Sequence, residues 1–479
     1  MSERSSRRPS VLWVRRDLRL GDHPALAVAA TTGPVLPLFV ADPALLRRAG
    51  APRLAALRGA LEALDRALDG RLCVVSGTPT TVVPAVARAV DADTVHVSED
   101  FAPYGAARDR RVERALAQDG RALVRTGSPY AVSPGRVRTR LGEPYKVFTP
   151  FRRAWYEHGW PAPAHVDAGV VGWCPAPSER NATPVPVAEA IPVEDPHAHL
   201  REGDLGPFGE GAALDRWVSF RAERLAGYAA DRDRPDLDAT SRLGVDLKFG
   251  TIHPRTLLAD LASLGATDSL PEDLASGRDA FASELAWREF YADVLHHRPR
   301  SAREEVDLRF AGVAWATGAE AEADFEAWKA GRTGYPIVDA GMRQLLAEGW
   351  MHNRLRMITA SFLTKDLHVD WRRGAAHFLD HLVDGDLASN QHGWQWTAGT
   401  GTDAAPYFRV FNPVAQGRRF DPEGDYVRRW VPELRGVAGP KVHEPRTDGE
   451  GGYPAPLVDH AQERRVAIAR YEAARDAAT

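Results

Sequence analysis

Residues 349–396 concentrate side chains that could bind a cofactor and a flat substrate. Arg356, Asp384 and Asp386 supply charges of both signs, and Met357 and Trp396 supply apolar surface. Paired arginine and aspartate can hold a molecule that carries both phosphate and ribose, and tryptophan and methionine can face a flat apolar ring. An ordinary helical core would show Leu, Ile and Ala here, so we interpret this segment as a site.

A second polar segment follows a helical pattern that contains Tyr228. It consists of Thr240, Ser241, Arg242, Leu243 and Gly244. Consecutive hydroxyls and backbone N–H groups at a turn can cradle a phosphate. Threonine and serine are also favoured helix N-caps, and the segment alone leaves both interpretations open.

Two carboxylates, Asp384 and Asp386, flank Gly385. Acids this close in sequence can cap a helix or bind a metal, but a magnesium site usually adds substrate phosphates and further oxygen ligands. The neighbours Asn390 and Trp394 suit a heterocycle better.

His377 and His381 lie four residues apart on a predicted helix, which is a metal-ligand spacing. The glutamate that follows the first histidine in metalloproteases is missing, and isolated histidine pairs are far more often surface or core residues. The Gly-x-Ser-x-Gly motif of serine hydrolases is also absent from the sequence. We expect no metal ion.

The helical segment 284–291 combines an acid, a base and aromatic rings. Glu284, Trp287, Arg288 and Tyr291 lie near one another at helical spacing. The plainest interpretation is an amphipathic helix with an ion pair between Glu284 and Arg288. The alternative is the wall of a substrate site.

The chain up to residue 130 alternates β-rich runs with helical patterns. The runs are 11–14, 35–40, 72–75, 94–97 and 122–124, and helical patterns include 54–68 and 108–118. This alternation predicts an α/β domain with a doubly wound parallel sheet. No Gly-x-Gly-x-x-Gly follows the first run, so the usual dinucleotide fingerprint is missing.

The remainder divides into a connector and a helical domain. Pro-x-Pro triplets between residues 131 and 205 exclude long helices, and so long a loop inside one compact domain would be improbable. Helical periodicity dominates from residue 206 to 479. It is clearest in 213–229, 281–296, 323–330, 338–346, 353–365, 374–382 and 461–474. We therefore predict an α/β domain over 1–130, a connector over 131–205 and an all-helical domain over 206–479.

Composition narrows the class of protein further. A chain of 479 residues is too long for one core. Its net charge of −4 does not exclude a local basic groove for nucleic acid. Cys73 and Cys174 have no metal-like spacing. Without a signal peptide or an 18-residue apolar stretch, we expect a cytoplasmic monomer that makes no membrane contact.

The segments described above resemble, nearly residue for residue, the photolyase/cryptochrome family. The resemblance covers about residues 11–444 and is strongest between residues 287 and 434. The members that the chain most resembles are the class I cyclobutane pyrimidine dimer photolyases. The resemblance implies that the helical domain binds FAD and that the substrate is damaged DNA.

The resemblance also implies which residues contact FAD. They are Tyr228, Thr240, Ser241, Arg242, Leu243, Gly244, Arg356, Asp384, Gly385, Asp386 and Asn390. Asp384 would pair with Arg356, and Asp386 would reach the ribityl chain or the ring edge. Gly244 departs from the family's serine, so one side-chain contact is lost. Asn390 would face flavin N5, where plant cryptochromes carry Asp, and it favours repair.

A further set of residues would contact the lesion and its DNA. These are Arg232, Glu284, Trp287, Arg288, Tyr291, Asn353, Arg354, Met357, Trp396, Arg409 and Gln416. Glu284 would hydrogen-bond a thymine carbonyl, while Trp287 and Trp396 would clasp a dimer extruded from single- or double-stranded DNA. The (6-4) photolyases carry histidines around Asn353 and Met357, so this chain matches the cyclobutane lesion.

Three tryptophans match the family's electron route from the surface to the flavin. They are Trp394, Trp371 and Trp315. Because residues 317–324 look lengthened relative to the family pattern, Trp328 is the alternative end of the route.

The family's sheet domain holds a light-harvesting antenna. Asp100 and Lys248 would be its polar contacts, because ligands usually sit at the mouth of an α/β sheet. They favour 8-hydroxy-5-deazaflavin over methenyltetrahydrofolate.

The implied function is light-dependent repair of cyclobutane pyrimidine dimers by electron transfer from photoexcited reduced FAD. Glu284, Asn390 and the three tryptophans would have catalytic roles. The alternative is a cryptochrome-type blue-light photoreceptor without repair activity.

Overall fold

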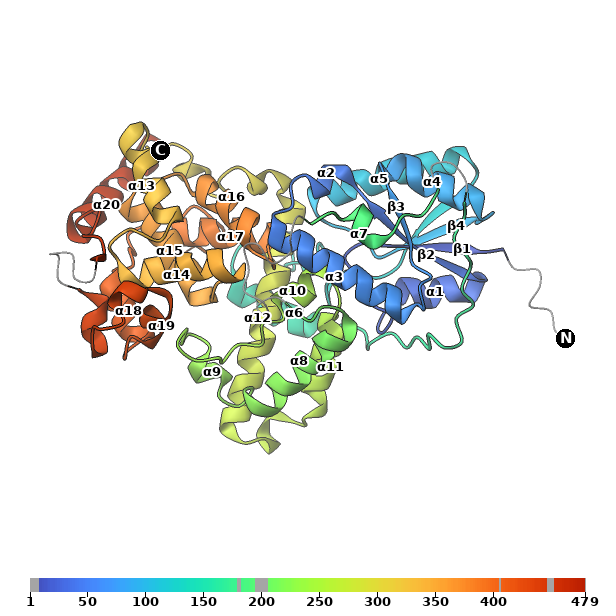
Figure 1. Ribbon diagram of the computed structural model, residues 1–479, viewed down its shortest axis with the longest axis horizontal. Coiled ribbons are helices and arrows are strands. Elements are labelled where there is room, and N and C mark those ends of the chain that lie inside the picture. The colour runs from blue at the N-terminus through green and yellow to red at the C-terminus, as the bar shows by residue number, and fades with distance from the viewer. Residues whose placement is uncertain (1–7, 179–181, 194–205, 405, 446–451, 479) are drawn as a thin grey trace.

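The computed structural model describes residues 8–178, 182–193, 206–404, 406–445 and 452–478. A parallel sheet lies at one end of the molecule and a helical domain at the other (Figure 1). The strands run in the order β3-β2-β1-β4-β5. Their bounds are β1 (Ser10–Val14), β2 (Val35–Ala41), β3 (Cys73–Ser76), β4 (Thr94–Val97) and β5 (Ala122–Arg125). The five predicted strands and the doubly wound sheet are confirmed.

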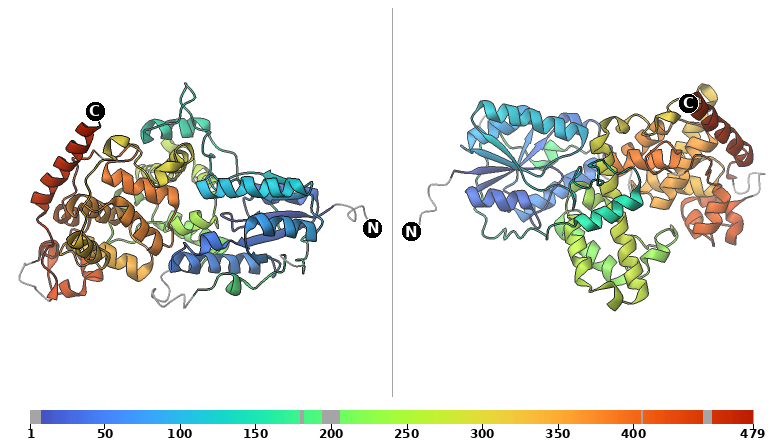
Figure 2. Two further views of the ribbon diagram at one scale, coloured as in Figure 1. Left: turned by 90° about the horizontal axis from the view of Figure 1, so that it is seen from above. Right: turned by 180° about the vertical axis from the view of Figure 1, so that it is seen from behind.

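The strand sequence explains why helices cover both faces of the sheet. Side chains alternate between faces along a strand, so Leu12 and Val14 point into one core and Val11 and Trp13 into another. The first core is covered by α1 (Pro24–Thr32) and α3 (Ala51–Ala67), and the second by α4 (Pro79–Ala89) and α5 (Pro103–Gln118). Strands buried on both faces carry near-continuous apolar runs. The two helical layers are visible from behind in Figure 2.

The strand order also fixes where the sheet can bind a ligand. The central strand β1 pairs with β2 on one side and with β4 on the other. The chain builds the sheet outward from β1 first on the β2 side and then on the β4 side, which makes a topological switch point at β1. Beyond the carboxyl ends of β1 and β4 lie Arg16 and Asp100. The short helix α2 (Pro43–Leu46) follows β2 at the same edge.

The helical domain consists of many packed helices of different lengths. They are α8 (Glu210–Glu223), α9 (Tyr228–Asp231), α10 (Gly244–Phe249), α11 (Pro254–Ser263), α12 (Glu272–His297), α13 (Ala319–Lys329), α14 (Pro336–Glu348), α15 (Asn353–Ser361), α16 (Trp371–His381), α17 (Leu387–Ala398), α18 (Pro413–Phe420), α19 (Asp425–Trp430) and α20 (His460–Ala477). A π-helical turn, η4 (Phe362–Asp366), continues α15. The predicted helical domain is confirmed.

Two helical patterns differ locally from the sequence-based expectation. The pattern 213–229 divides into α8 and α9, because residues 224–227 do not continue the helix. The pattern 353–365 changes to a π-helix after residue 361.

The connector contains a helix that the proline pattern did not predict. This helix, α6 (Phe148–His158), buries Phe148, Phe151 and Trp155 in a core shared with α8 and α12. The short α7 (Val187–Ala190) packs on the sheet core. Because α6 carries a buried aromatic face, the connector is a packed part of the molecule. Its boundaries at residues 130 and 205 stay a prediction, and part of it lies outside the described residues.

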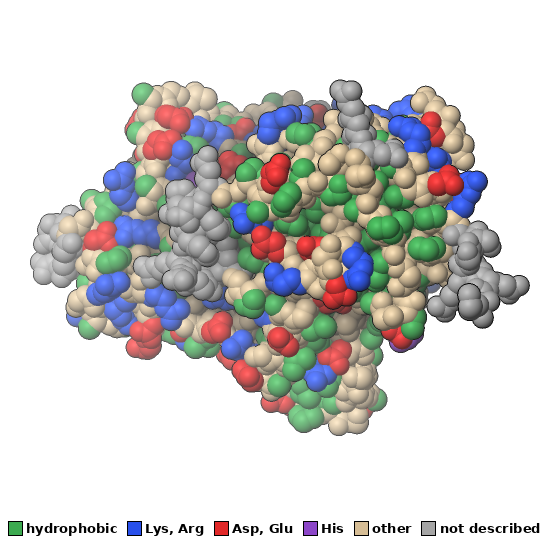
Figure 3. Space-filling model, turned by 45° about the vertical axis from the view of Figure 1, so that its right-hand side comes forward, with side chains coloured by type: hydrophobic (Ala, Val, Ile, Leu, Met, Phe, Trp, Pro, Cys, Tyr) green, Lys and Arg blue, Asp and Glu red, His purple; other side chains and the backbone are tan. Residues whose placement is uncertain are grey.

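The surface carries charges of both signs. Figure 3 shows Lys and Arg side chains interspersed with Asp and Glu on the face that it presents. Among the helices of the described ranges, none is both long and apolar enough to cross a bilayer.

Candidate functional site

One cavity of about 390 Å³ brings together most of the predicted site. It opens among α12, α15, α16 and α17. Fifteen predicted residues line it: Arg232, Glu284, Trp287, Arg288, Tyr291, Asn353, Arg354, Arg356, Met357, Asp384, Gly385, Asp386, Asn390, Trp394 and Trp396. Segments that lie more than 150 residues apart in the chain therefore meet around a single space.

Asp384 and Arg356 form the polar end of this cavity. Arg356 Nη2 donates to Asp384 Oδ2 at 2.9 Å, as predicted, and Arg356 Nε donates to the carbonyl of Met351 at 2.8 Å. Asp384 Oδ1 is buried and has no hydrogen-bond partner among the described residues. A buried carboxylate oxygen without a donor is costly, so this atom fits a ligand that brings a donor.

Asp386 joins the two domains. Its Oδ1 caps α17 by accepting from the N–H groups of Ala388 and Ser389. Its Oδ2 accepts from Arg16 Nη2 of the sheet domain at 2.7 Å. Burial alone would raise the pKa of Asp386, but the charges of Arg16 and Lys248 outweigh it and hold that pKa well below its usual range. The carboxylate is therefore ionised and fixed.

Asn390 presents a defined amide to the cavity. Its Nδ2 donates to the carbonyl of Ala375 at 3.0 Å and to Gln391 Oε1 at 2.8 Å. These bonds leave the carbonyl oxygen as the group that can accept a hydrogen bond from a ligand.

The predicted phosphate turn lies beside the cavity. The N-cap of α10 is Leu243, which makes no side-chain cap hydrogen bond, although its N–H donates to Ser241 Oγ at 3.4 Å. A Cβ at Gly244 would lie 2.6 Å from Asp384 Oδ2. The turn therefore touches the carboxylate end of the cavity. Tyr228, also a predicted contact, is buried against Phe220 and Phe281.

Arg242 lies at the edge of this turn. Its guanidinium stacks on Trp350 at 4.3 Å, and its backbone has a left-handed φ of 52°.

The opposite wall of the cavity is aromatic and acidic. Arg232 Nη1 donates to Glu284 Oε1 at 2.5 Å. The ion pair between Glu284 and Arg288, which the simple amphipathic-helix interpretation would require, is not formed, because Arg288 donates to the carbonyls of Pro129 and Leu247, each at 3.0 Å. Arg288 thus ties the helix to the domain junction, while Glu284 keeps its carboxylate at the cavity.

Sequence reasoning missed three residues at or near this wall. Phe148 stacks on Trp287, Asp233 accepts from Arg354 Nη2 at 2.6 Å, and Arg419 lines a neighbouring hollow of about 280 Å³. The predicted residues Arg409 and Gln416 line the same hollow, together with Arg354. The spacing of Phe148, Phe151 and Trp155 could have indicated a helix, but no sequence signal marks the stack itself.

The four candidate tryptophans lie on α13, α16, α17 and the loop that precedes α13. Trp394 of α17 and Trp371 of α16 are both buried, and the Trp394 ring presses on Gly374, where a Cβ would overlap it. Trp328 is fully buried and 6.1 Å from Trp394 between ring centroids. Trp315 is partly exposed and packs on the edge of the same core.

A second cavity of about 400 Å³ lies at the mouth of the sheet. Asp100 and Lys248 both line it, as do Arg16 and Asp386. Burial, with the nearby charge of Arg16, lowers the pKa of Lys248 to about 8. Gly385 and Asp386 border both cavities. Within the described ranges, no cluster of His, Cys, Asp or Glu could hold a metal ion.

Comparison with known proteins identifies the family. Residues 10–167 match the family model described as DNA photolyase, and residues 281–473 match the FAD binding domain of DNA photolyase. A deoxyribodipyrimidine photo-lyase of Halobacterium salinarum is 40% identical, covering 97% of this chain and 99% of its own.

Two solved structures are similar over nearly the whole chain. A bacterial class III photolyase from Agrobacterium tumefaciens has a TM-score of 0.88 at 36% identity, covering 99% of this chain and 100% of its own. A Synechocystis cryptochrome has a TM-score of 0.83 at 26% identity, covering 96% and 99%. This chain therefore belongs to the photolyase/cryptochrome family, and its helical domain is an FAD-binding domain.

Proposed function

We propose that this chain is a deoxyribodipyrimidine photolyase that repairs cyclobutane pyrimidine dimers in DNA under light. The observation that carries the proposal is the single cavity, in which Asp384 and Asn390 at one end meet Glu284, Trp287 and Trp396 at the other. Reduced FAD, when bound, supplies light-driven transfer of one electron to the lesion. The relatives at about 40% identity carry the same name over nearly their full length.

The chain's own residues supply positioning and charge. Trp287 and Trp396 would stack on the two bases of the dimer and exclude water from it. The carboxyl group of Glu284 would form a hydrogen bond with a base carbonyl, where negative charge develops. Arg232, paired with Glu284, holds the acid in place.

Flavin binding would use two groups of residues. Asp384, Arg356, Asp386, Gly385 and Asn390 line the cavity, and Tyr228 and residues 240–244 lie beside it. The orphaned oxygen of Asp384 and the free amide oxygen of Asn390 suit the polar edge of a flavin. Phosphate anchoring of DNA would fall to Arg354, Arg409 and Gln416 around the neighbouring hollow.

We further propose class I within the family, on the resemblance of residues 284–291 and 349–357. The second cavity would hold the antenna, and we propose 8-hydroxy-5-deazaflavin, because Asp100 and Lys248 both line that cavity. Trp315 would end the electron route, since it reaches solvent and Trp328 does not. A cytoplasmic monomer is proposed on the sequence alone.

The test is illumination of a dimer-containing oligonucleotide with reduced protein, followed by counting of the remaining dimers. Repair of single- and double-stranded substrate is expected. Protein that binds FAD but repairs neither substrate would instead support the alternative of a cryptochrome-type photoreceptor. The antenna is tested by expression in a host that makes deazaflavin, where retention of folate alone would reverse that assignment.

A further inference from the structure

Residues 135–147 form a projecting arm between β5 and α6, called the arm below. Its tip is a tight turn, because the N–H of Gly142 donates to the carbonyl of Thr139, and the N–H of Thr139 donates to the carbonyl of Glu143, each at 2.9 Å. Arg138 braces this turn by donating to the carbonyls of Gly135 and Gly142. Its own hydrogen bonds therefore hold the arm in one shape.

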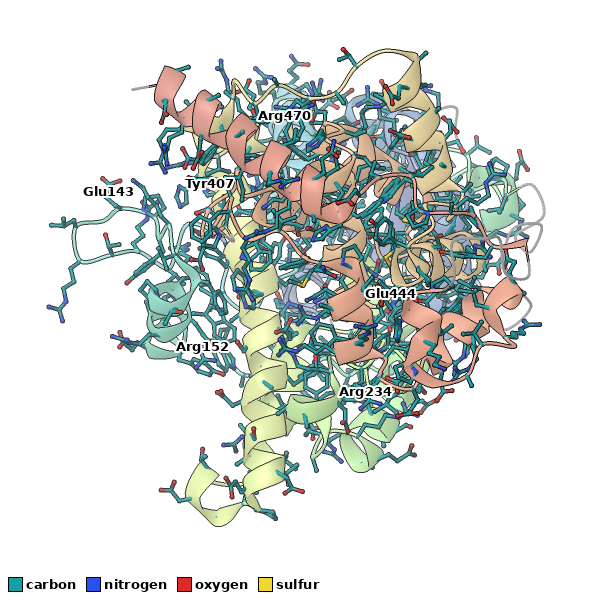
Figure 4. All side chains as sticks on the ribbon, turned by 90° about the vertical axis from the view of Figure 1, so that its left-hand side faces the viewer. Glu143, Arg152, Arg234, Tyr407, Glu444 and Arg470 are labelled. Carbon is teal, nitrogen blue, oxygen red and sulfur yellow. The ribbon has the colours of Figure 1, made fainter. Side chains whose placement is uncertain are left out.

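The arm extends beyond the body of the molecule. Figure 4 shows Glu143 on this arm, projecting outward above the helix that carries Arg152. In the left view of Figure 2 the arm projects on the opposite side from α3. Val137 and Tyr145 pack on the core beneath the arm, so the part that leaves the globular surface and is available to a partner is the tip together with the exposed side chains on either side of it.

The charge of the arm is strongly positive. Four exposed cations lie on it, Arg136, Arg138, Arg140 and Lys146, with one carboxylate, Glu143. Along the described chain, the nearest paired cations before and after the arm are Arg125 and Arg152, and none of the arm's four cations has a carboxylate within 4.0 Å. Most arginines of the lesion cavity are by contrast matched with a carboxylate, as Arg232 is. Unmatched cations on a projecting arm fit a partner that carries many anionic groups.

The base of the arm is anchored at the rim of the lesion cavity. Thr402 Oγ1 donates to the carbonyl of Lys146 at 2.7 Å, and the N–H of Phe148 donates to Asp403 Oδ2 at 3.0 Å. Phe148 in turn stacks on Trp287 of the cavity wall. A chain advances about 3.3 Å per extended residue, so the tip can reach about 13 Å from this rim, comparable with the ~12 Å width of a DNA major groove.

We propose that the arm binds the undamaged strand of duplex DNA beside the lesion, with Arg136 and Arg140 on its phosphates. This inference rests on the proposed function. A dimer extruded from its strand occupies the cavity itself, whereas a duplex brings a second phosphate backbone outside the cavity, toward the arm. Phosphate contacts position DNA without reading its sequence, which agrees with the absence of any base-reading helix on the arm.

The test compares binding of one dimer-containing strand, alone and in a duplex. In the double variant R136Q/R140Q, two phosphate contacts are lost. Each contact contributes about 0.9 to the slope of log affinity against log salt for duplex DNA. The duplex slope should therefore fall by about 1.8, and binding and repair of the single strand should not change. The matched control is R47Q/R66Q, which removes the same charge from exposed arginines on the α2 and α3 side.

Each other outcome has a defined meaning. If the double variant weakens binding of the single strand and of the duplex equally, the arm contacts the damaged strand and the proposal is overturned. An unchanged salt slope for the duplex would also overturn the proposal. R140E should weaken duplex binding more than R140Q, because it adds repulsion. FAD absorbance of each variant reports its fold. If the unmodified protein repairs no dimers in either substrate, the proposed function fails, and the inference about the arm, which rests on that function, fails with it.

Discussion

The ring of Phe148 lies flat on the indole of Trp287, with centroids 3.7 Å apart and planes 11° from parallel. One face of the tryptophan is thus covered by a residue of the connector, and its orientation is set before any substrate arrives. Asp403 holds the backbone of Phe148. The connector is therefore part of the wall that would receive the lesion.

The first prediction concerns this stack. Phe148→Ala should weaken binding of dimer-containing DNA, since an aromatic pair contributes about 0.5–1.5 kcal/mol beyond burial, or about 2- to 13-fold in Kd. Flavin content should not change, because Phe148 does not line the polar end of the cavity. Titration of labelled oligonucleotide measures the effect. Tyr156→Ala, on the same helix but 40% exposed, is the control and should bind normally.

The second prediction concerns Glu284 and Arg232. Glu284→Gln should leave FAD binding and fold intact but lower the repair yield per absorbed photon. An ordinary surface ion pair contributes only about 0–1 kcal/mol, so a purely structural pair would make the change nearly silent. Arg232→Gln should also lower the yield, because Glu284 loses the donor that holds it. An unchanged yield in Glu284→Gln would remove this acid from the chemistry.

The sequence predicted the sheet well because each of its strands is a short apolar run that periodicity can identify. Val11 to Val14 shows why, since all four side chains are buried and no polar residue interrupts them. The secondary structure of the connector was harder to predict. Its prolines suggested an irregular chain, yet α6 begins before Pro150 and is stabilised by burial of Phe151 and Trp155. Tertiary packing overrode a local signal there.

The sequence predicted which residues line the site, but it did not predict which of them form hydrogen bonds and ion pairs with one another. Glu284 and Arg288 have ideal helical spacing for an ion pair, but Arg232, from a distant segment, takes the acid. Asp386 was expected to reach a ligand, and it also binds Arg16 across the domain junction. Such contacts depend on how separate segments pack, which spacing within one helix cannot show.

The third prediction concerns Gly244. A Cβ at this position would lie 2.6 Å from Asp384 Oδ2 and 3.2 Å from its Cβ, so Gly244→Ala should displace that carboxylate. Purified Gly244→Ala should retain less FAD, and Asp384→Asn should retain less still, because it weakens the pair with Arg356. Absorbance at the flavin band relative to protein measures retention. Gly211→Ala, where a Cβ meets open space, is the matched control and should retain FAD fully.

The fourth prediction separates the candidate electron routes. Trp394→Phe and Trp371→Phe should slow light-driven reduction of oxidised flavin greatly. Trp315→Phe should also slow it, because this ring reaches the surface. Trp328→Phe should not, although Trp328 contacts Trp394, because Trp328 is fully buried. Time-resolved absorbance follows the reduction, and repair by already reduced protein should survive in all four variants. If Trp328→Phe slows the reduction and Trp315→Phe does not, Trp328 is the end of the electron route.

The fifth prediction is a pH dependence at Lys365. Its ammonium is fully buried and donates to the carbonyls of Tyr407 and Arg409. Burial lowers its pKa to about 7, against 10.5 for the exposed group, and only nearby Asp366 opposes this. Between these values the unfolded chain binds the proton and the native chain does not, so the free energy of unfolding should rise with pH, by up to about 1.4 kcal/mol per unit.

The variant Lys365→Met has no titrating group at this position, so it is the control for the pH dependence of the wild-type protein. Below pH 7 the wild-type protein bears the full cost of a buried charge, and the variant does not. Denaturant unfolding of both proteins between pH 6.5 and 9.5 should show the wild type gaining stability relative to Lys365→Met as the pH rises. Asp366 responds to the substitution, because the charge of Lys365 opposes the burial that raises the pKa of Asp366 to about 6, so its effect falls at the acidic end of this range. The titrating groups that do not interact with Lys365 are common to both proteins and cancel in the difference. A difference that stays constant over this range would mean that Lys365 remains protonated, held by the two carbonyls that it contacts.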